Sequence, residues 1–152
     1  MMIPLSVVVP NRNNVSWLAR CLDSVLDQSL KKTEVIVVDD ASTDESPVII
    51  REYMNRFPGR VRGIFLARQL GVARARDHGI REARGQFVSS LDADDYLIHP
   101  QKLERELQLA RTPSETGRNI AGFSGIIQVD AAGNRLESGK NLSIVEGRIT
   151  GE

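Results

Sequence analysis

Three aspartates directly follow a short apolar run in this sequence. Residues 86–91 read Gln-Phe-Val-Ser-Ser-Leu, a pattern typical of a β-strand, and Asp92, Asp94 and Asp95 come next. Ionised carboxylates so close together repel one another and are stabilised by water or by a cation. Carboxylate oxygens are also ligands that hard divalent metals prefer. The stretch therefore indicates a metal site at a strand end, with a plain Asp-rich turn as the alternative interpretation.

A second acidic strand end occurs earlier, where a run of β-branched residues at 34–38 is followed by Asp39 and Asp40. The first β-prone run ends instead in turn formers, Pro-Asn-Arg-Asn-Asn at 10–14. In a parallel sheet, right-handed crossovers bring these three loops to one edge, where ligands bind in open α/β folds. Carboxylates at this edge could accept hydrogen bonds from a nucleobase or ribose, while others hold a metal-bound diphosphate.

β-prone and helical runs alternate through most of the chain, and they predict the elements that position these loops. We expect strands at 3–9, 34–38, 61–66 and 87–91, and helices at 17–26, 45–57, 71–83 and 100–109. This alternation predicts a mostly parallel α/β sheet with helices on both faces. A strand at 120–129, a hairpin turn at 130–134 and weak patterning beyond them predict a short mixed or antiparallel C-terminal portion. The length suits a single domain over residues 1–152.

Several conspicuous residues have plain structural interpretations. Trp17 and Cys21 share the apolar stripe of the first helix, so we expect both in the core. Asp44 is placed to cap the second helix. His78 and His99 lack the paired spacing of a metal site and fit surface or capping roles. A solvated helix face accounts for the remaining arginines of the third helical region: Arg74, Arg81 and Arg84.

Composition excludes several classes of protein. The 152 residues carry 20 basic and 20 acidic side chains, so the net charge is zero and nothing indicates a nucleic-acid partner. A single cysteine rules out an internal disulfide framework and fits a reducing compartment. The first apolar run is too short for a signal peptide or a membrane span, and we expect a cytoplasmic protein, acting in solution or at the inner face of the membrane. The first strand is not followed by Gly-x-Gly-x-x-Gly, and the chain has no Walker A string.

Linked motifs make the chain resemble a family 2 glycosyltransferase of the GT-A fold. The resemblance rests on five stretches, in the family's order and spacing, and covers roughly residues 3–110. They are Ser-Val-Val-Val-Pro-Asn-Arg-Asn at 6–13, Leu-Asp-Ser-Val-Leu-Asp-Gln-Ser at 22–29, Glu-Val-Ile-Val-Val-Asp-Asp-Ala-Ser-Thr-Asp at 34–44, and Gly-Val-Ala-Arg-Ala-Arg-Asp-His-Gly-Ile at 71–80 followed by Leu-Asp-Ala-Asp-Asp at 91–95.

The resemblance implies metal-dependent, inverting transfer of a sugar from a nucleoside-diphosphate sugar, with a UDP-sugar favoured, to a saccharide or lipid-linked acceptor. Asp40 is then the partner of the base with Asp39 behind it, and Arg76 lies near the nucleotide or its phosphates. Asp94 is the first choice as ligand of Mn²⁺ or Mg²⁺, with Asp92 as a second ligand or a ribose contact. The other residues implied to line the donor site are Pro10, Asn11, Arg12, Asn13 and Ala93.

The chain also departs from the family. Gln69 and Asp77 stand where the family often has Asn. The catalytic base is not evident, since neither Glu137 nor Glu146 lies in a recognisable motif, and we expect the chain to be the donor-binding part of a longer enzyme, cut at its C-terminus. Two alternatives stay open: a nucleotide-sugar-binding domain without catalysis, and a receiver-type signalling domain. The sequence names neither the sugar nor the acceptor, and gives no signal of the oligomeric state.

Overall fold

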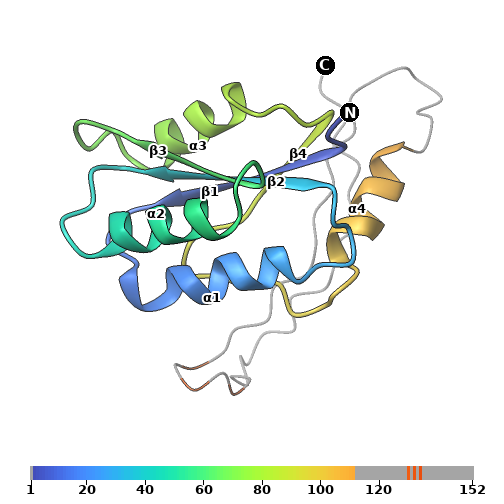
Figure 1. Cartoon of the computed structure of the whole chain (residues 1–152), viewed down its shortest axis with the longest axis horizontal. Helices are drawn as coiled ribbons and strands as arrows, with labels where there is room; N and C mark the ends of the chain where they lie inside the picture. The colour runs from blue at the N-terminus through green and yellow to red at the C-terminus, as the bar shows by residue number, and fades with distance from the viewer. Residues whose placement is uncertain (1, 112–129, 131, 133, 135–152) are drawn as a thin grey trace, which may run out of the picture. The chain divides into compact units, whose positions relative to one another are not determined.

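The computed structural model describes residues 2–111 together with 130, 132 and 134. Strands and helices alternate along the chain (Figure 1), as the sequence pattern predicts. The strands are β1 (Leu5–Asn11), β2 (Thr33–Asp39), β3 (Val61–Phe65) and β4 (Phe87–Ser90), and the helices are α1 (Val15–Leu26), α2 (Ser46–Arg56), α3 (Val72–Arg81) and α4 (Lys102–Arg111). The chain separates into two compact units, residues 1–107 and 108–152, and the first contains all four strands.

The four strands form one parallel sheet in the order β3-β2-β1-β4. This is the order of a nucleotide-binding α/β half, in which β1 lies between β2 and the strand that follows the crossover. A receiver domain has β1 between β2 and β3, the order 2-1-3-4-5. The observed order therefore rules out the receiver-type alternative.

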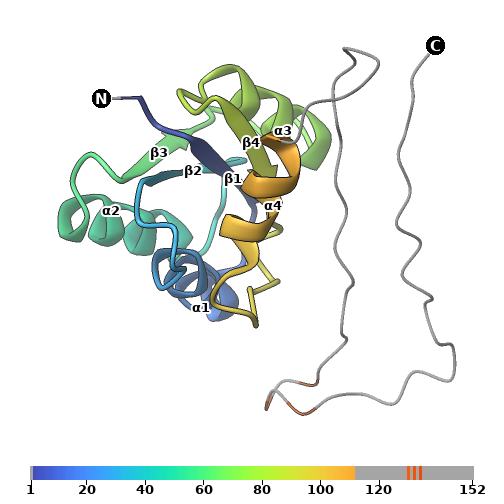
Figure 2. The ribbon, with the colours of Figure 1, turned by 90° about the vertical axis from the view of Figure 1, so that its right-hand side faces the viewer.

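Helices cover both faces of the sheet, as predicted. Figures 1 and 2 show α1 and α2 on one face and α3 on the other. Since successive residues of a strand point to opposite faces, Val7, Val9 and Val37 join the core under α1 and α2, while Ile36 and Val38 pack with Ala75 of α3. Both β1 and β2 are buried along their whole length.

The contact between α3 and the sheet depends on a glycine. A Cβ built on Gly79 would lie 2.5 Å from Val8 Cγ1 and 2.9 Å from Val38 Cγ2. Both distances are shorter than carbon atoms tolerate, so any larger residue would push α3 away from β1 and β2. The close approach matters for the site, because α3 carries Arg76.

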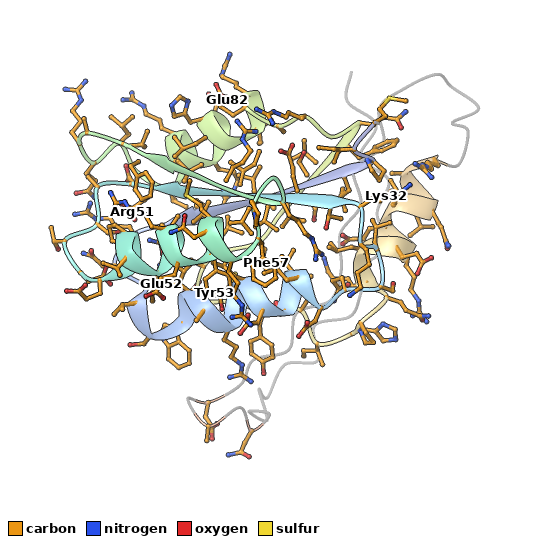
Figure 3. The ribbon with its side chains drawn as sticks, in the orientation of Figure 1. Lys32, Arg51, Glu52, Tyr53, Phe57 and Glu82 are labelled. Atoms are coloured by element: carbon orange, nitrogen blue, oxygen red, sulfur yellow. The ribbon has the colours of Figure 1, made fainter. Side chains whose placement is uncertain are left out.

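On the opposite face, α2 is held to α1 by a tyrosine. The Tyr53 hydroxyl donates to Asp23 Oδ1 at 2.7 Å, and the Tyr53 ring lies 6.0 Å from the ring of Phe57, the residue that follows α2 (Figure 3). Burial, followed by this hydrogen bond and the charge of Asp23, raises the pKa of Tyr53 well above its usual range. Tyr53 therefore stays a neutral donor.

Two local predictions were wrong. The first strand does not stop before Pro10 but continues to Asn11, because Asn11 pairs with Asp39 at the end of β2. Trp17 is not a core residue: it is 37% exposed, whereas Leu18, Cys21 and Leu22 are fully buried. The buried stripe begins at Leu18, and Trp17 lies at its border in the first turn of α1.

The last predicted elements are only partly described. The helix after Pro100 is present, with Leu103 and Leu107 buried, although Leu109 is exposed. At the predicted hairpin turn, the Asp130 backbone N–H donates to Asn134 O, and its carboxylate accepts the N–H groups of Ala132 and Asn134. The predicted strand at 120–129 and the weakly patterned tail lie outside the described residues. Among residues 2–111, no helix has the length and apolar character that crossing a bilayer requires.

Candidate donor-binding site

Loops that leave the carboxyl ends of the four strands lie at one edge of the sheet, on the left in Figure 1. This edge is where parallel α/β sheets bind ligands. The strand ends bring together the regions selected from the sequence, residues 10–14 after β1, 39–44 after β2 and 91–95 after β4. The loop between β3 and α3, residues 66–71, joins them.

Asn11 and Ser42 hold Asp39 from two sides. Asp39 Oδ1 accepts Asn11 Nδ2 at 2.8 Å and the Ser42 hydroxyl at 2.6 Å, while Oδ2 accepts the Ser42 N–H at 3.0 Å. Asn11 and Asp39 are each only 2% exposed. The carboxylate fixes the orientation of the amide, because only Nδ2 can donate to it. Asn11 Oδ1 is then left without a partner among the described residues, so the network has an unused acceptor at the end of β1.

Arg12 and Asn13 join the first loop to the second. Arg12 Nη1 donates to the carbonyls of Asp40, at 2.6 Å, and Ala41, at 3.0 Å. Asn13 Oδ1 accepts the Thr43 N–H at 2.8 Å. Asn13 and Ala41 both have φ of 53°, a left-handed conformation that side chains disfavour. Strain of this kind persists only where neighbouring bonds fix the backbone, and here both residues lie at the candidate site.

Asp40 is buried and fastens the loop that begins α3. Its Oδ1 accepts the Leu70 N–H at 2.6 Å and its Oδ2 accepts the Gly71 N–H at 2.8 Å. Gly71 has φ of 92°, which glycine adopts without strain, so the loop can turn both N–H groups toward one carboxylate. Each oxygen keeps a second lone pair that could accept a base N–H. The predicted role of Asp40 as base partner is compatible with this geometry, and stays a prediction.

The acidic strand end is paired with an arginine side chain. Arg76 of α3 donates from Nη2 to Asp92 Oδ1 at 2.5 Å and from Nε to the Ser90 hydroxyl at 3.0 Å. Asp94 and Asp95 have exposed side chains and no ion pair among the described residues. Burial, and then the charges of Asp94 and Asp92, raise the pKa of Asp95. Repulsion from the neighbouring carboxylates thus adds to the effect of burial, in the direction that the sequence predicts.

Cys21 is a core thiol that supports the acidic strand end. It is fully buried, and its Sγ donates to the Asp92 carbonyl at 3.5 Å. Burial, followed by the charges of Asp95, Asp94 and Asp92, raises the pKa of Cys21 to about 12. The thiol therefore stays protonated, which confirms its predicted structural role. Ala93 is buried as well, with 1% of the residue exposed, and its predicted place at the donor site stays a prediction.

Asp92 and Asp94 fit a divalent metal in part. Among the described residues, no group of three or more His, Cys, Asp or Glu side chains is arranged to hold an ion. Mg²⁺ and Mn²⁺ sites that act on nucleotides, however, commonly use one or two carboxylates and complete their ligands with substrate phosphates and water. Two exposed or half-exposed carboxylates at a strand end meet that requirement. Such a site needs the diphosphate itself as a ligand.

Asp44 connects the first turns of α1 and α2, a role that the sequence did not predict correctly. The N-cap position of α2 falls on Glu45, one residue after the predicted Asp44, and Glu45 makes no capping bond with its side chain. Asp44 instead accepts the Ser46 N–H of α2 at 2.9 Å through Oδ1 and the Val15 N–H of α1 at 3.0 Å through Oδ2. Although burial raises its pKa, bonds from Ser46 and Val15 outweigh burial, and the net pKa is lowered.

Replacing Asp44 by alanine should destabilise the protein by about 1–2 kcal/mol, because one carboxylate satisfies donors at two helix N-termini. The measurement is urea denaturation followed by circular dichroism. Glu45→Ala is the matched control, since Glu45 is a neighbouring acidic residue without a side-chain cap. Equal destabilisation by the two substitutions would contradict the role assigned to Asp44.

The remaining arginines and histidines behave as predicted. Arg74, Arg81 and Arg84 are exposed, and Arg81 pairs with Asp77 at 2.8 Å on the surface of α3. His99 is exposed and caps the next segment, because its Nδ1 accepts the Gln101 N–H at 3.1 Å. Sequence reasoning missed Ser42, Ser90 and Gly71. Of these only Ser42 carried a local signal, since it lies three residues after Asp39, a spacing at which an aspartate side chain can accept a backbone N–H, as it does at a helix N-cap.

Comparison with solved structures places the fold in a class. The S. aureus protein TarS, solved as residues 1–349 in complex with UDP, superposes with a TM-score of 0.63 at 30% identity, over 69% of this chain and 31% of that one. The mannosyltransferase PcManGT from Pyrobaculum calidifontis, in complex with GDP-Man and Mn²⁺, gives a TM-score of 0.68 at 28% identity, over 74% and 34%. The parallel sheet with this site is therefore the GT-A fold of glycosyltransferases.

The sequence assigns the family. The profile of glycosyl transferase family 2 matches residues 6–125, and the chain belongs to that family. An uncharacterized glycosyltransferase of Nostoc sp. is 36% identical over 113 residues, 74% of this chain and 34% of the relative. Chondroitin synthase of Escherichia coli is 33% identical over 150 residues, 93% of this chain and 20% of the relative. The chain thus spans about a third or less of the length of these relatives.

Proposed function

We propose that this chain carries the donor-binding half of a metal-dependent, inverting glycosyltransferase that uses a nucleoside-diphosphate sugar. The observation that carries the proposal is the meeting of Asp39, Asp40 and the Asp92–Asp94 motif at one edge of a family 2 sheet. A uridine nucleotide is favoured. The solved relatives support a nucleotide-sugar donor and divide over the base, since TarS was solved with UDP and with UDP-GlcNAc and PcManGT with GDP-Man.

The residues divide between the two ends of the proposed donor. Asp40, supported by Asp39 and the Pro10–Asn13 loop, would hold the base or ribose at the end of β2, where Asn11 holds the Asp39 carboxylate and Arg12 the Asp40 carbonyl. Asp94 and Asp92 would hold Mn²⁺ or Mg²⁺, and Arg76 of α3 would meet the phosphates. A divalent cation bound there would neutralise negative charge on the departing diphosphate.

The acceptor half of the reaction needs groups beyond those assigned so far. Inverting transfer requires a base that takes the proton of the acceptor hydroxyl as it attacks the anomeric carbon from the face opposite the leaving group. The two glutamates considered for this role, Glu137 and Glu146, lie outside the described residues. The saccharide or lipid-linked acceptor and the cytoplasmic location stay predictions. A domain that binds nucleotide sugars without catalysis is the second candidate, the alternative that the sequence left open.

Calorimetric titration of the 152-residue chain with UDP, GDP, CDP and ADP tests the proposal, with Mn²⁺ or with EDTA. We expect one nucleoside diphosphate, UDP in the first place, to bind in Mn²⁺ at least about tenfold more tightly than in EDTA. If the chain binds none of the four nucleoside diphosphates in Mn²⁺, the proposed function is wrong. Transfer assays on a longer chain that includes the acceptor half then separate an enzyme from a binding domain.

A further inference from the structure

The ion pair between Arg76 and Asp92 lies at the metal end of the proposed donor site. The guanidinium takes one oxygen of Asp92 and is held in place by the Ser90 hydroxyl. The two side chains are 33% and 50% exposed, so either can exchange its partner for a ligand. The guanidinium of Arg76 therefore lies next to Asp92, one of the two carboxylates proposed as metal ligands.

We propose that Arg76 is a positioning residue that occupies Asp92 until a diphosphate arrives, so that the metal and the nucleotide bind cooperatively. This inference rests on the proposed function. Without nucleotide, Mn²⁺ must displace the guanidinium from Asp92 and tolerate its charge nearby. With nucleotide, the guanidinium transfers to phosphate oxygens, which it binds with its planar donors, and Asp92 is released to the cation.

The anchoring of α3 supports this exchange. Asp40 holds the Leu70 and Gly71 N–H groups at the start of the helix, and Gly79 allows the helix to lie directly on Val8 and Val38. Arg76 therefore projects from a fixed backbone between these two anchors. On the other side, the backbone of Asp92 is fixed, because its carbonyl accepts the Asp95 N–H at 3.0 Å and the Cys21 thiol. Only the two side chains need to move.

Charge also favours coupling over independent binding. A guanidinium within a few ångströms of a divalent cation repels it, and at a partly solvated site this lowers the metal's affinity by about three- to tenfold. The same guanidinium paired with phosphate strengthens nucleotide binding by about tenfold or more. One residue therefore opposes the metal alone and favours the metal together with its diphosphate. By linkage, the nucleotide must then raise the affinity for Mn²⁺ as much as Mn²⁺ raises that for the nucleotide.

Titration of Mn²⁺ alone, followed by electron paramagnetic resonance of the free ion, and calorimetry of UDP in saturating Mn²⁺ test the inference on the 152-residue chain. In Arg76→Gln we expect Mn²⁺ alone to bind about three- to tenfold more tightly and UDP in Mn²⁺ about tenfold more weakly. Arg76→Lys keeps the charge and should keep most of the suppression of Mn²⁺ binding. Arg81→Gln is the matched control, a basic residue of the same helix paired with Asp77, and should change neither affinity.

The outcomes separate this inference from the proposed function. If Arg76→Gln binds Mn²⁺ alone no more tightly than the unchanged protein, or binds UDP equally well, the exchange is wrong while the donor site stands. If the unchanged protein binds no nucleoside diphosphate in Mn²⁺, the proposed function fails, and the exchange fails with it. Circular dichroism of each variant confirms that it is folded before its affinities are compared.

Discussion

Substitution of Asp94 by asparagine should abolish most of the dependence of nucleotide binding on metal. Asp94, like Asp95, is an exposed carboxylate of the acidic strand end that forms no ion pair among the described residues, whereas Asp92 is paired with Arg76. The Asp-x-Asp spacing makes Asp94 the first choice as metal ligand. Asparagine keeps the size of the side chain and removes its charge, so a metal ligand is weakened without a packing change. We expect the affinity for UDP in Mn²⁺ to fall by at least about tenfold, toward the value in EDTA, which should itself change little. Calorimetry in both buffers measures the two affinities.

Asp77→Asn is the matched control for this substitution. Asp77 is also an exposed aspartate, and its pairing with Arg81 on the surface of α3 places it outside the acidic strand end. The control should bind UDP and Mn²⁺ as the unchanged protein does. If the Asp94→Asn variant binds UDP in Mn²⁺ as tightly as the unchanged protein does, Asp94 is not a metal ligand.

Local sequence pattern predicted the elements and their order well, and the reason is physical. Runs of β-branched residues such as 35–38 favour buried parallel strands, in a sheet that helices cover on both faces. Apolar residues at helical spacing identify each helix. The pattern failed at borders. Trp17 has the helical spacing of the apolar stripe of α1, but it lies at the edge of that stripe and is partly exposed. Pro10 does not end β1, because the next residue, Asn11, donates a hydrogen bond to Asp39 of β2.

The candidate site could be predicted only as far as strand ends determine it. Parallel topology brings Asp39, Asp40 and Asp92 to one edge, and this much follows from the sequence. The partners that orient them come from distant segments: Asn11 lies 28 residues from Asp39, and Leu70 lies 30 residues from Asp40. No local sequence pattern predicts a hydrogen bond between residues so far apart in the chain. The same holds for the pairing of Arg76 with Asp92, although the motif had placed Arg76 near the phosphates.

Glu34 shows most clearly what the sequence left hidden. It was predicted only as the first residue of a strand, yet its carboxylate is buried at the edge of the sheet opposite the candidate site, with 1% of the residue exposed. Its Oε1 accepts the Ser6 hydroxyl and the Arg84 N–H, both at 2.6 Å, and its Oε2 pairs with Arg62 at 3.3 Å. The Ser6 hydroxyl in turn accepts the Gly85 N–H. One buried charge thus joins β1, β2, β3 and the connection from α3 to β4.

Replacement of Glu34 by alanine should destabilise the protein by about 3–5 kcal/mol at neutral pH, because it leaves several buried donors and the partly buried Arg62 without their acceptor. Urea denaturation measures the loss. Glu52→Ala serves as the control, since Glu52 lies on the exposed side of α2 (Figure 3) and should change stability by less than about 0.5 kcal/mol.

The pH dependence of this loss distinguishes the charge of Glu34 from the space it fills. Burial raises the pKa of Glu34, but hydrogen bonds from Ser6 and Arg84 and the charge of Arg62 outweigh burial, so the folded-state pKa lies below the ordinary 4.5. A lowered pKa contributes stability that is present above pH 4.5 and is lost as pH falls through the folded-state value. Glu34→Gln should therefore differ from the unchanged protein most at neutral pH and progressively less in acid. A difference that stays constant as the pH falls well below 4.5 would show that the side chain acts by packing alone.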